Sequence, residues 1–318
     1  MVPVLLPVNN KAPATACRIF RGLVQVARGM ADKRDCGNGQ LPATPMYSLE
    51  NQSVRIWAVA NQKGGVGKTT SVVALGGLLA ERGKRVLVVD LDPHGSLTSW
   101  FGYDPDTIAH SVFDLFQHQG KVPEGLPAQL ITETSCKGLS LLPASAALAT
   151  LERRMIGVEG MGLIISRALT QLWDDFDYVL LDNTPSLGVL MVNALAAAQH
   201  LIIPVQTEFL AIKGLERMLH TLKMIMRSQK NELSYTIVPT LYDRRTQASV
   251  KSLNLLRKTY RESLWQFAIP VDTKFRDASQ GGITPSALDA ETHGVRAYSH
   301  LLDDLMARVG RVKERQHG

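Results

Sequence analysis

The segment Asn61-Gln62-Lys63-Gly64-Gly65-Val66-Gly67-Lys68-Thr69-Thr70 decides the fold of this chain. An apolar run over 54–60 precedes it and predicts a buried β-strand, and a helical pattern begins directly after it. The three glycines let the backbone curl so that successive N–H groups face inward, and the helix N-terminus adds its partial positive charge. A strand, a glycine-rich turn and a helix in this order predict a loop that binds the phosphates of a nucleotide.

Two side chains of this phosphate loop carry most of its expected chemistry. Lys68 is expected to reach the β- and γ-phosphates of ATP, and Thr69 to place its hydroxyl on Mg²⁺. The other loop residues expected to surround the nucleotide are Gly64, Gly65, Val66, Gly67 and Thr70. The general pattern G-x-x-x-x-G-K-[ST] has glycine where Gln62 stands, and a second lysine, Lys63, precedes the glycines instead. Glycine-rich turns also occur without a ligand, but the Gly-Lys-Thr-Thr that follows favours binding.

Short apolar runs alternate with longer helical patterns over the rest of the chain. This alternation is typical of repeated βαβ units, and most of the runs lack polar alternation, as strands covered on both faces do. We therefore predict an α/β fold with a mostly parallel twisted sheet and helices on both faces. The expected strands are 54–60, 85–90, 139–143, 178–182, 200–205, 235–241 and 264–269. The expected helices are 69–82, 161–174, 187–198, 210–229, 246–261 and 293–309.

The composition is that of a globular protein. With 318 residues and 45% hydrophobic content, the chain can bury a sizeable core. Residues 54–309 show no duplication and no linker, so they are expected to form a single ATPase domain followed by a polar tail at 310–318. Residues 1–53 are broken by prolines and glycines and are expected to be mostly a disordered extension. A short basic amphipathic helix at 18–28 is the alternative for part of that extension.

Several features of the sequence favour the cytoplasm. No run approaches the roughly 18 apolar residues of a membrane-spanning helix, and the first residues lack the features of a signal peptide. Cys17, Cys36 and Cys136 lack metal-ligand spacing and fit a reduced compartment. The net charge of +6 and the pI near 9.2 fit a polyanionic partner without requiring one.

Carboxylates end two of the expected strands. Asp90 and Asp92 close the second strand in the segment VVDLDPHGS, and Asp182 closes the fourth in YVLLD. Because the carboxyl ends of parallel strands meet at one edge of a sheet, these groups are expected to face the phosphate loop, where Mg²⁺ and an attacking water need them. The alternative for Asp90 and Asp92 is that they only cap the following helix.

The position of Lys63 ahead of GGVGKT resembles the deviant Walker A loop of the ParA and MinD superfamily of dimerising ATPases. The resemblance extends over nearly all of residues 54–308 and is greatest to ParA-type partition proteins. Within that family, the segments DPHGS and VQTEFLAIKGLERM resemble most the branch that positions chemotaxis arrays. The resemblance implies a homodimer that forms with ATP, slow hydrolysis, and an adaptor protein that stimulates it. It does not name the cargo.

The same resemblance implies roles for individual residues. Lys63, Lys68 and Asp92 would be catalytic, with Asp92 orienting the hydrolytic water. Lys63 would cross a two-fold interface and stabilise the phosphoryl group on the partner's nucleotide, which is the task of an arginine finger elsewhere. The expected supports for Mg²⁺ are Thr69, Asp90 and Asp182, and the expected neighbours of the adenine base are Thr240 and Pro270.

Four residues depart from the pattern of the resembling proteins. His94 stands in place of a glutamine, and Asn183 and Thr184 stand where relatives usually have Cys-Pro after the aspartate. His293 lies where many relatives carry a DNA-contacting arginine. What these departures change is open at this point.

A basic face runs along the expected helix 210–229. Lys213, Arg217, His220, Lys223 and Arg227 fall within about 120° of its circumference. Charged helix faces are usually only solvated surface. The resemblance instead favours non-specific DNA binding through this face and the next helix. That helix adds Lys251, Lys258 and Arg261.

Other classes of protein remain as alternatives. A MinD-like ATPase would settle on a membrane through a C-terminal amphipathic helix, but the apolar stripe over 301–309 lacks an aromatic anchor and predicts a helix packed on the core. A nitrogenase-type reductase would need paired cluster cysteines, which Cys136 alone cannot supply. A small-molecule ligase would need a substrate pocket, for which no motif is visible. A binding module that has lost hydrolysis would not need Asp92 and Asp182 beside Lys68.

Overall fold

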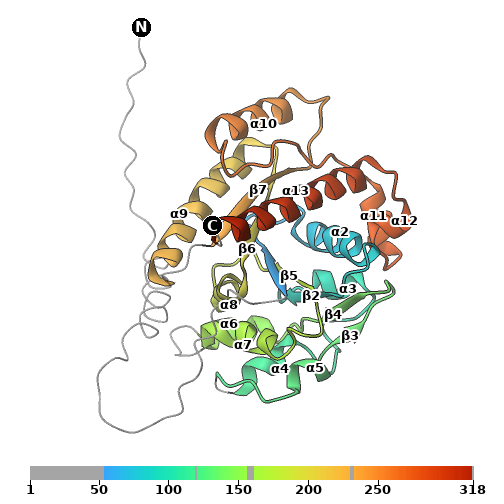
Figure 1. Ribbon diagram of the computed structural model, residues 1–318, viewed down its shortest axis with the longest axis vertical. Helices are drawn as coiled ribbons and strands as arrows, with labels where there is room; N and C mark the ends of the chain where they lie inside the picture. The colour runs from blue at the N-terminus through green and yellow to red at the C-terminus, as the bar shows by residue number, and fades with distance from the viewer. Residues whose placement is uncertain (1–53, 119, 156–160, 230–232, 317–318) are drawn as a thin grey trace.

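A twisted seven-stranded sheet forms the centre of the structure (Figure 1). The computed structural model describes residues 54–118, 120–155, 161–229 and 233–316, so the expectations for residues 1–53, including a helix at 18–28, fall outside the described residues. The strands are β1 Arg55–Val59, β2 Val86–Leu91, β3 Thr132–Glu133, β4 Leu139–Leu142, β5 Tyr178–Asn183, β6 His200–Gln206 and β7 Ser234–Thr240. Their order across the sheet is β3-β4-β2-β5-β1-β6-β7, and all pairings are parallel except that of β3 with β4.

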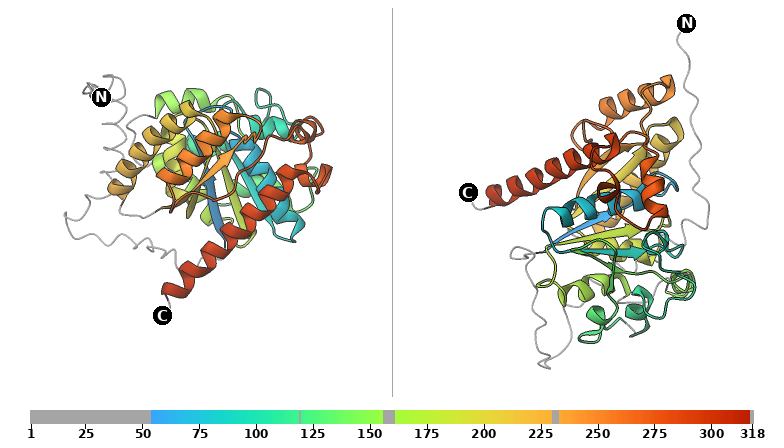
Figure 2. Two further views of the ribbon diagram at one scale, coloured as in Figure 1. Left: turned by 90° about the horizontal axis from the view of Figure 1, so that it is seen from above. Right: turned by 90° about the vertical axis from the view of Figure 1, so that its right-hand side faces the viewer.

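Helices cover both faces of the sheet, as Figure 2 shows. One layer consists of α2 Lys68–Glu81, α3 Ser96–Trp100, α11 Lys274–Gln280, α12 Pro285–Leu288 and α13 His293–Gln316. The other layer consists of α4 Val112–Leu115, α5 Leu126–Gln129, α6 Leu148–Arg154, α7 Ile164–Thr170, α8 Val189–Ala197, α9 Phe209–Gln229 and α10 Gln247–Thr259. Strand side chains alternate between two apolar cores, so Val86 and Val88 of β2 face one layer while Leu87 and Val89 face the other. The predicted α/β class with helices on both faces is confirmed.

The strand order brings the expected site residues to one edge of the sheet. β1 lies between β5 and β6, and β2 lies on the other side of β5. Val59 at the end of β1 pairs with Asp182 on β5, which also pairs with Asp90 on β2. The phosphate loop continues β1, so it lies beside the carboxylates that end β2 and β5.

The expectation of a strand at 264–269 was wrong. This segment follows β7 but forms only isolated bridges, at Leu264 with Ile237 and at Pro270 with Tyr242. Pro239 lies in the part of β7 between these bridges and has no N–H to donate, so a continuous ladder cannot form there. The side chain of Trp265 ties this segment to α13, since its indole N–H donates to Asp304 Oδ2 at 2.9 Å.

The short strand β3 was not predicted, and the remaining differences concern helices. α13 continues to Gln316, through residues that we expected to be a polar tail, because Arg311, Lys313 and Glu314 are good helix formers. The short helices α3 to α6, α11 and α12 were not predicted, since one or two turns are too short for an apolar period to show.

His200 at the start of β6 is a buried histidine held at both ring nitrogens. Its Nδ1 lies 2.7 Å from Ser234 Oγ, and its Nε2 lies 3.0 Å from Thr236 Oγ1. Burial, with a smaller contribution from Arg308, lowers its pKa from 6.5 to about 4. Between these values the unfolded chain binds a proton that the folded chain excludes, so the free energy of unfolding falls as the pH falls.

We expect His200 to lower the free energy of unfolding by up to about 1.4 kcal/mol per pH unit between its two pKa values. His200→Gln stays neutral and should remove this part of the slope, which denaturant titrations at several pH values would measure. His118→Gln changes an exposed histidine and should leave the slope as it is. Equal slopes for the wild type and the His200 variant would contradict the assignment.

Candidate nucleotide-binding and catalytic site

The phosphate loop has the backbone geometry of an anion cradle. Gly65 and Gly67 have φ angles of 71° and 90°, in the left-handed region where any side chain would be strained. Val66 between them is fully buried, and its carbonyl accepts a 2.8 Å hydrogen bond from the Thr240 hydroxyl. The loop leads directly into α2, whose N-terminal N–H groups are available to phosphate oxygens.

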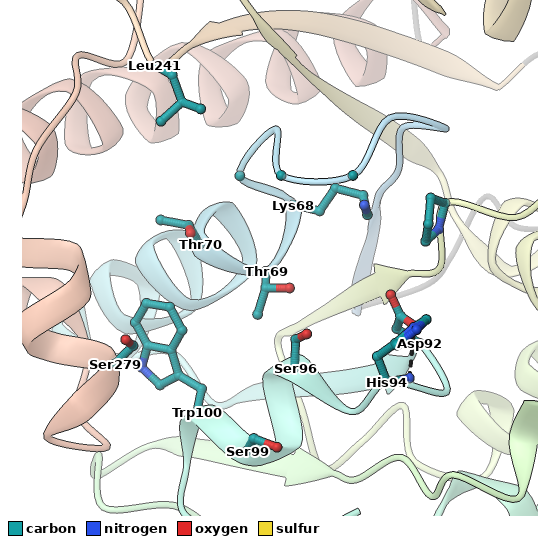
Figure 3. A pocket seen from close by; sticks show the side chains of 14 residues that line it. Lys68, Thr69, Thr70, Asp92, His94, Ser96, Ser99, Trp100, Leu241 and Ser279 are labelled. Atoms are coloured by element: carbon teal, nitrogen blue, oxygen red, sulfur yellow. Dashed lines mark hydrogen bonds and ion pairs between the residues drawn. The ribbon is translucent and has the colours of Figure 1, made fainter.

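The loop opens into a cavity of about 850 Å³, large enough for a nucleotide (Figure 3). Figure 3 shows Asp92 and His94 on one side of this cavity and Trp100 and Ser279 on the other. The lining residues without an assigned role from the sequence are Ser96, Ser99, Trp100, Pro185, Leu241 and Ser279. Ser96 and Ser99 follow DPHG on one helical turn, which is a signal that could have found them. Trp100, Leu241 and Ser279 are placed only by the tertiary fold.

Thr69 and Asp182 meet at the point where a metal is expected. The Thr69 hydroxyl donates to Asp182 Oδ2 at 2.7 Å, while Asp182 Oδ1 is buried without a hydrogen-bond partner. Burial, reinforced by Asp90, raises the pKa of Asp182 well above its usual value, and a nearby dication would favour the charged form instead.

These residues fit Mg²⁺, which would offset the negative charge of the phosphates. Mg²⁺ is commonly held by one or two protein oxygens together with phosphate and water. Such a site does not require three or more His, Cys, Asp or Glu side chains. In the described part of the chain, no group of three or more of these side chains could hold a metal ion.

Asp90 is not placed as a metal ligand. Its Oδ2 accepts hydrogen bonds from the backbone and the hydroxyl of Thr98, at 2.8 and 2.7 Å, and its Oδ1 accepts from the Asp92 N–H at 3.0 Å. Protein donors therefore occupy both oxygens, so Asp90 holds the backbone around Asp92 and Thr98, and the expectation that it supports the metal shell stays a prediction. Burial raises the pKa of this carboxyl to about 6.

Asp92 and Lys68 both line the cavity. Asp92 Oδ1 accepts from the His94 N–H at 3.0 Å and lies 2.9 Å from His94 Nδ1. Burial lowers the pKa of Lys68, while the charges of Asp182 and Asp92 act in the opposite direction. The two side chains can thus flank a terminal phosphate and its attacking water. The departure His94 touches the carboxylate expected to orient that water.

Lys63 is not among the residues that line the cavity. Its Nζ forms an ion pair with Glu208 and lies 3.3 Å from Gln206 Oε1. The Lys63 and Glu208 side chains are 31% and 41% exposed, so this pair contributes little free energy and can open at small cost. The sequence pattern contained Gln206 and Glu208 after a strand but offered no reason to place them beside Lys63.

Thr240 and Pro270, the expected neighbours of the adenine base, do not line the cavity. The Thr240 hydroxyl is buried against Val66, and Pro270 pairs with Tyr242. The loop backbone uses the only hydroxyl proton of Thr240, and the expectation that Thr240 and Pro270 neighbour the adenine base stays a prediction. Leu241, with a φ of 51°, is the residue of this strand end that reaches the cavity.

Asn183 and Thr184, two further departures, have structural contacts. The Asn183 side chain donates to the carbonyls of Val59 and Leu181, each at 3.2 Å, and so ties the end of β5 to the end of β1. Thr184 Oγ1 accepts from the Ser186 N–H at 3.2 Å in the following turn. Both residues therefore fix the segment that follows Asp182.

The basic residues lie on two neighbouring helices, α9 and α10, except that Arg261 follows the end of α10 (Figure 1). Those with exposed side chains are Lys213, Arg217, His220, Lys223, Lys251, Lys258 and Arg261. Lys213 is paired with Glu216 at 2.9 Å, which partly offsets the positive charge of Lys213 on this surface. The side chain of Arg227 lies outside the described residues, and His293 is exposed at the start of α13.

Sequence comparison then identifies the family. A family model described as an AAA domain matches residues 54–235. The chromosome-partitioning ATPase Soj of Thermus thermophilus is 38% identical over 259 residues, which cover 80% of this chain and 97% of the relative. The sporulation initiation inhibitor protein Soj of Bacillus subtilis is 32% identical over 254 residues, covering 80% and 98%. The chain belongs to the ParA and MinD superfamily.

A solved structure agrees with this assignment. Cobyrinic acid a,c-diamide synthase from Mycobacterium smegmatis, with bound ADP and magnesium, is 37% identical and aligns with a TM-score of 0.68 over 80% of this chain and 94% of its own. As a member of the ParA and MinD superfamily, the chain is an ATPase whose cofactors are ATP and Mg²⁺. Lys68 and Thr69 line the cavity, and Asp182 accepts a hydrogen bond from the Thr69 hydroxyl beside it; that these three residues hold ATP and Mg²⁺ stays a prediction.

Asp92→Asn tests the catalytic assignment. The amide keeps the shape of the side chain but loses the charge that would orient water, so we expect kcat to fall by about 10²- to 10⁴-fold. Affinity for Mg-ATP, measured with a fluorescent analogue, should change little. Asp106→Asn, at an exposed aspartate outside the cavity, is the control. Wild-type turnover in the Asp92 variant would refute the assignment.

Proposed function

We propose that this ATPase is a dimerising switch of the ParA type, which hydrolyses ATP slowly and positions or partitions a cellular cargo with the help of an adaptor protein. The observation that carries the proposal is the placement of Lys63. A lysine that served the nucleotide of its own subunit would line the cavity, as Lys68 does. Lys63 instead lies outside it in a weak, partly exposed ion pair, and we infer that it leaves this pair to serve the nucleotide of a second subunit.

An apolar surface lies beside Lys63 and supports a subunit contact there. Phe209 and Leu210 directly follow Glu208 and are 60% and 71% exposed. The exposed Leu241 at the cavity is close by, because the Thr207 hydroxyl donates to its carbonyl at 3.4 Å. Large apolar side chains gathered on a surface are typical of an interface. A second subunit placed on this surface would cover them together with the cavity.

In such a dimer, the rate of ATP hydrolysis would set how long the two subunits stay together. ATP would join two subunits because each Lys63 needs a γ-phosphate in the partner, and hydrolysis would release them. Every surface that requires two subunits would appear and disappear with the nucleotide state.

Lys63→Ala should separate nucleotide binding from dimerisation. We expect the variant to bind Mg-ATP about as well as the wild type but to sediment as a monomer with ATP, since it lacks the charge that would bridge the subunits. Lys137→Ala, at an exposed lysine far from the phosphate loop, should dimerise normally. A Lys63→Ala protein that sediments as a dimer with wild-type turnover would rule out this role.

We further propose that the ATP dimer binds DNA without sequence preference. The exposed side of α9 begins with Phe209 and Leu210 and continues with Lys213, Arg217 and Lys223, so one helix joins the proposed subunit contact to the basic face. Two basic faces in one particle would double the number of phosphate contacts, and affinity would then depend steeply on the nucleotide. This arrangement suits a protein that is released from DNA by hydrolysis.

Charge reversal tests the DNA proposal. With ATP present, Arg217→Glu with Lys223→Glu should lower affinity for a random duplex at least about tenfold and reduce its dependence on salt, because phosphate contacts are lost. Lys121→Glu with Lys137→Glu makes the same charge change at exposed residues outside α9 and α10 and is the control. Binding to one sequence only, insensitive to salt, would contradict non-specific binding.

The membrane-bound alternative has less support. Leu301, Leu302 and Leu305 of α13 are buried in the core that includes α2, so they are not available to a lipid surface. In the described part of the chain, no helix has the length and apolar character to cross a bilayer. Flotation with liposomes that requires ATP would nevertheless favour the alternative over DNA binding.

Amide synthesis is a second candidate, because the Mycobacterium smegmatis protein of 37% identity is named a diamide synthase. That chemistry activates a carboxylic acid with ATP and needs a nitrogen donor. ADP formation that requires a carboxylic-acid substrate and ammonia, and that DNA does not stimulate, would favour it.

A further inference from the structure

A buried hydrogen-bond chain connects the C-terminal helix to the phosphate loop. Tyr298 of α13 is 1% exposed, and its hydroxyl lies 2.8 Å from Ser71 Oγ on the first turn of α2. Ser71 Oγ in turn donates to the carbonyl of Gly67 at 2.7 Å. α13 and the loop are more than two hundred residues apart in the sequence, and this chain joins them inside the core.

The donors and acceptors of these two hydrogen bonds follow from the number of hydroxyl protons. A carbonyl can only accept, so the single hydroxyl proton of Ser71 is used on Gly67 and the Tyr298 hydroxyl donates to Ser71. Burial raises the pKa of Tyr298 to about 12, so the donor keeps its proton throughout the neutral range. Neither hydroxyl is left unsatisfied, as buried polar groups require.

The hydrogen bonds from Tyr298 through Ser71 can affect the nucleotide at Gly67. Gly67 is the left-handed residue immediately before Lys68, and its carbonyl also accepts the Ser71 N–H at 2.9 Å. Two donors on one carbonyl fix the orientation of the Gly67–Lys68 peptide, which begins the row of N–H groups aimed at the phosphates. A loop held in this orientation before ATP arrives loses less entropy on binding.

α13 also contacts a segment that is bonded to the strand end beside Leu241. The Gly294 N–H in its first turn donates to Asp272 Oδ2 at 3.0 Å. Asp272 lies in the segment whose Val271 N–H bonds to the Tyr242 carbonyl at 3.1 Å, directly after Leu241 of the cavity wall. One helix is therefore linked to the phosphate loop through Ser71 and to the segment beside Leu241 through Asp272.

We propose that Tyr298 is a positioning residue that couples the docking of α13 to nucleotide binding. The hydroxyl holds the phosphate loop in its binding conformation, and a bound nucleotide in turn holds α13 in place, because linkage between two sites is reciprocal. The coupling concerns a single subunit and does not depend on dimerisation or DNA.

The test compares Tyr298→Phe with Ser71→Ala in the full chain. Phenylalanine fills the same space, with its edge contact to Phe275 retained, and α13 stays anchored by Leu301, Leu302 and the 2.7 Å Arg82–Asp303 ion pair. Mg-ADP is the probe, so that ATP-driven dimerisation does not contribute. A fluorescent ADP analogue gives affinity, and hydrogen–deuterium exchange of peptides over 293–308 reports α13.

In the wild type we expect Mg-ADP to slow exchange in α13. Each variant should bind Mg-ADP about fivefold more weakly, the effect of losing one buried hydrogen bond, and should lose the nucleotide-dependent slowing. The double variant should be no worse than either single one, because both break the same chain. Tyr178→Phe is the control, since it removes a buried tyrosine hydroxyl that bonds Arg55 at the far end of β5.

Turnover at saturating ATP should be unchanged, so that only the apparent KM rises. Wild-type affinity in Tyr298→Phe, or an α13 that responds normally to Mg-ADP in either variant, would overturn the proposal. So would a wild-type α13 that does not respond to Mg-ADP. If Tyr298→Phe fails to fold, Ser71→Ala decides by the same two measurements.

Discussion

The structure depends on one electrostatic requirement, which is to hold several phosphate charges on backbone N–H groups at the end of a central parallel strand. β1 is suited to this because it lies between β5 and β6, so the loop that follows it has neighbouring strand ends on both sides. The left-handed Gly65 and Gly67 turn the N–H groups inward, and α2 adds its N-terminus. The hydroxyls of Thr240 and Ser71 fix the carbonyls of Val66 and Gly67, which keeps those N–H groups aligned.

The carboxylates around the loop divide into those that face the ligand and those that support the fold. Asp182 has an unsatisfied buried oxygen beside Thr69, and Asp92 lines the cavity, whereas Asp90 is fully engaged by Thr98 and the Asp92 backbone. Burial makes the charged forms of Asp90 and Asp182 costly. A bound Mg²⁺ would supply positive charge beside Asp182 and favour its charged form. Lys63, the second lysine of the loop, is held outside the cavity by Glu208.

The sequence predicted the parts of the fold and site that depend on local pattern. The strand before the loop, the glycines, Lys68, Thr69 and the aspartates at strand ends each follow from residue type and spacing within a short segment. It could not predict the pairing of Lys63 with Glu208, or the contacts of Thr240 with Val66 and Tyr298 with Ser71, because these join segments far apart in the chain. The apolar segment 264–269 was predicted to be a strand, but a proline in its neighbour, β7, prevents a continuous hydrogen-bond ladder between them.

The central claim is that Lys63 serves the nucleotide of the other subunit, and mixed dimers test it most directly. Lys63→Ala and Asp92→Asn subunits should each be inactive alone. When they are mixed with ATP, the site of the Lys63→Ala subunit keeps Asp92 and receives Lys63 from its partner. The account predicts that turnover reappears in the mixture, in up to about half of the sites of each mixed dimer. A mixture as inactive as its separate components, although mixed dimers form, would show that Lys63 acts within its own subunit and would contradict the account.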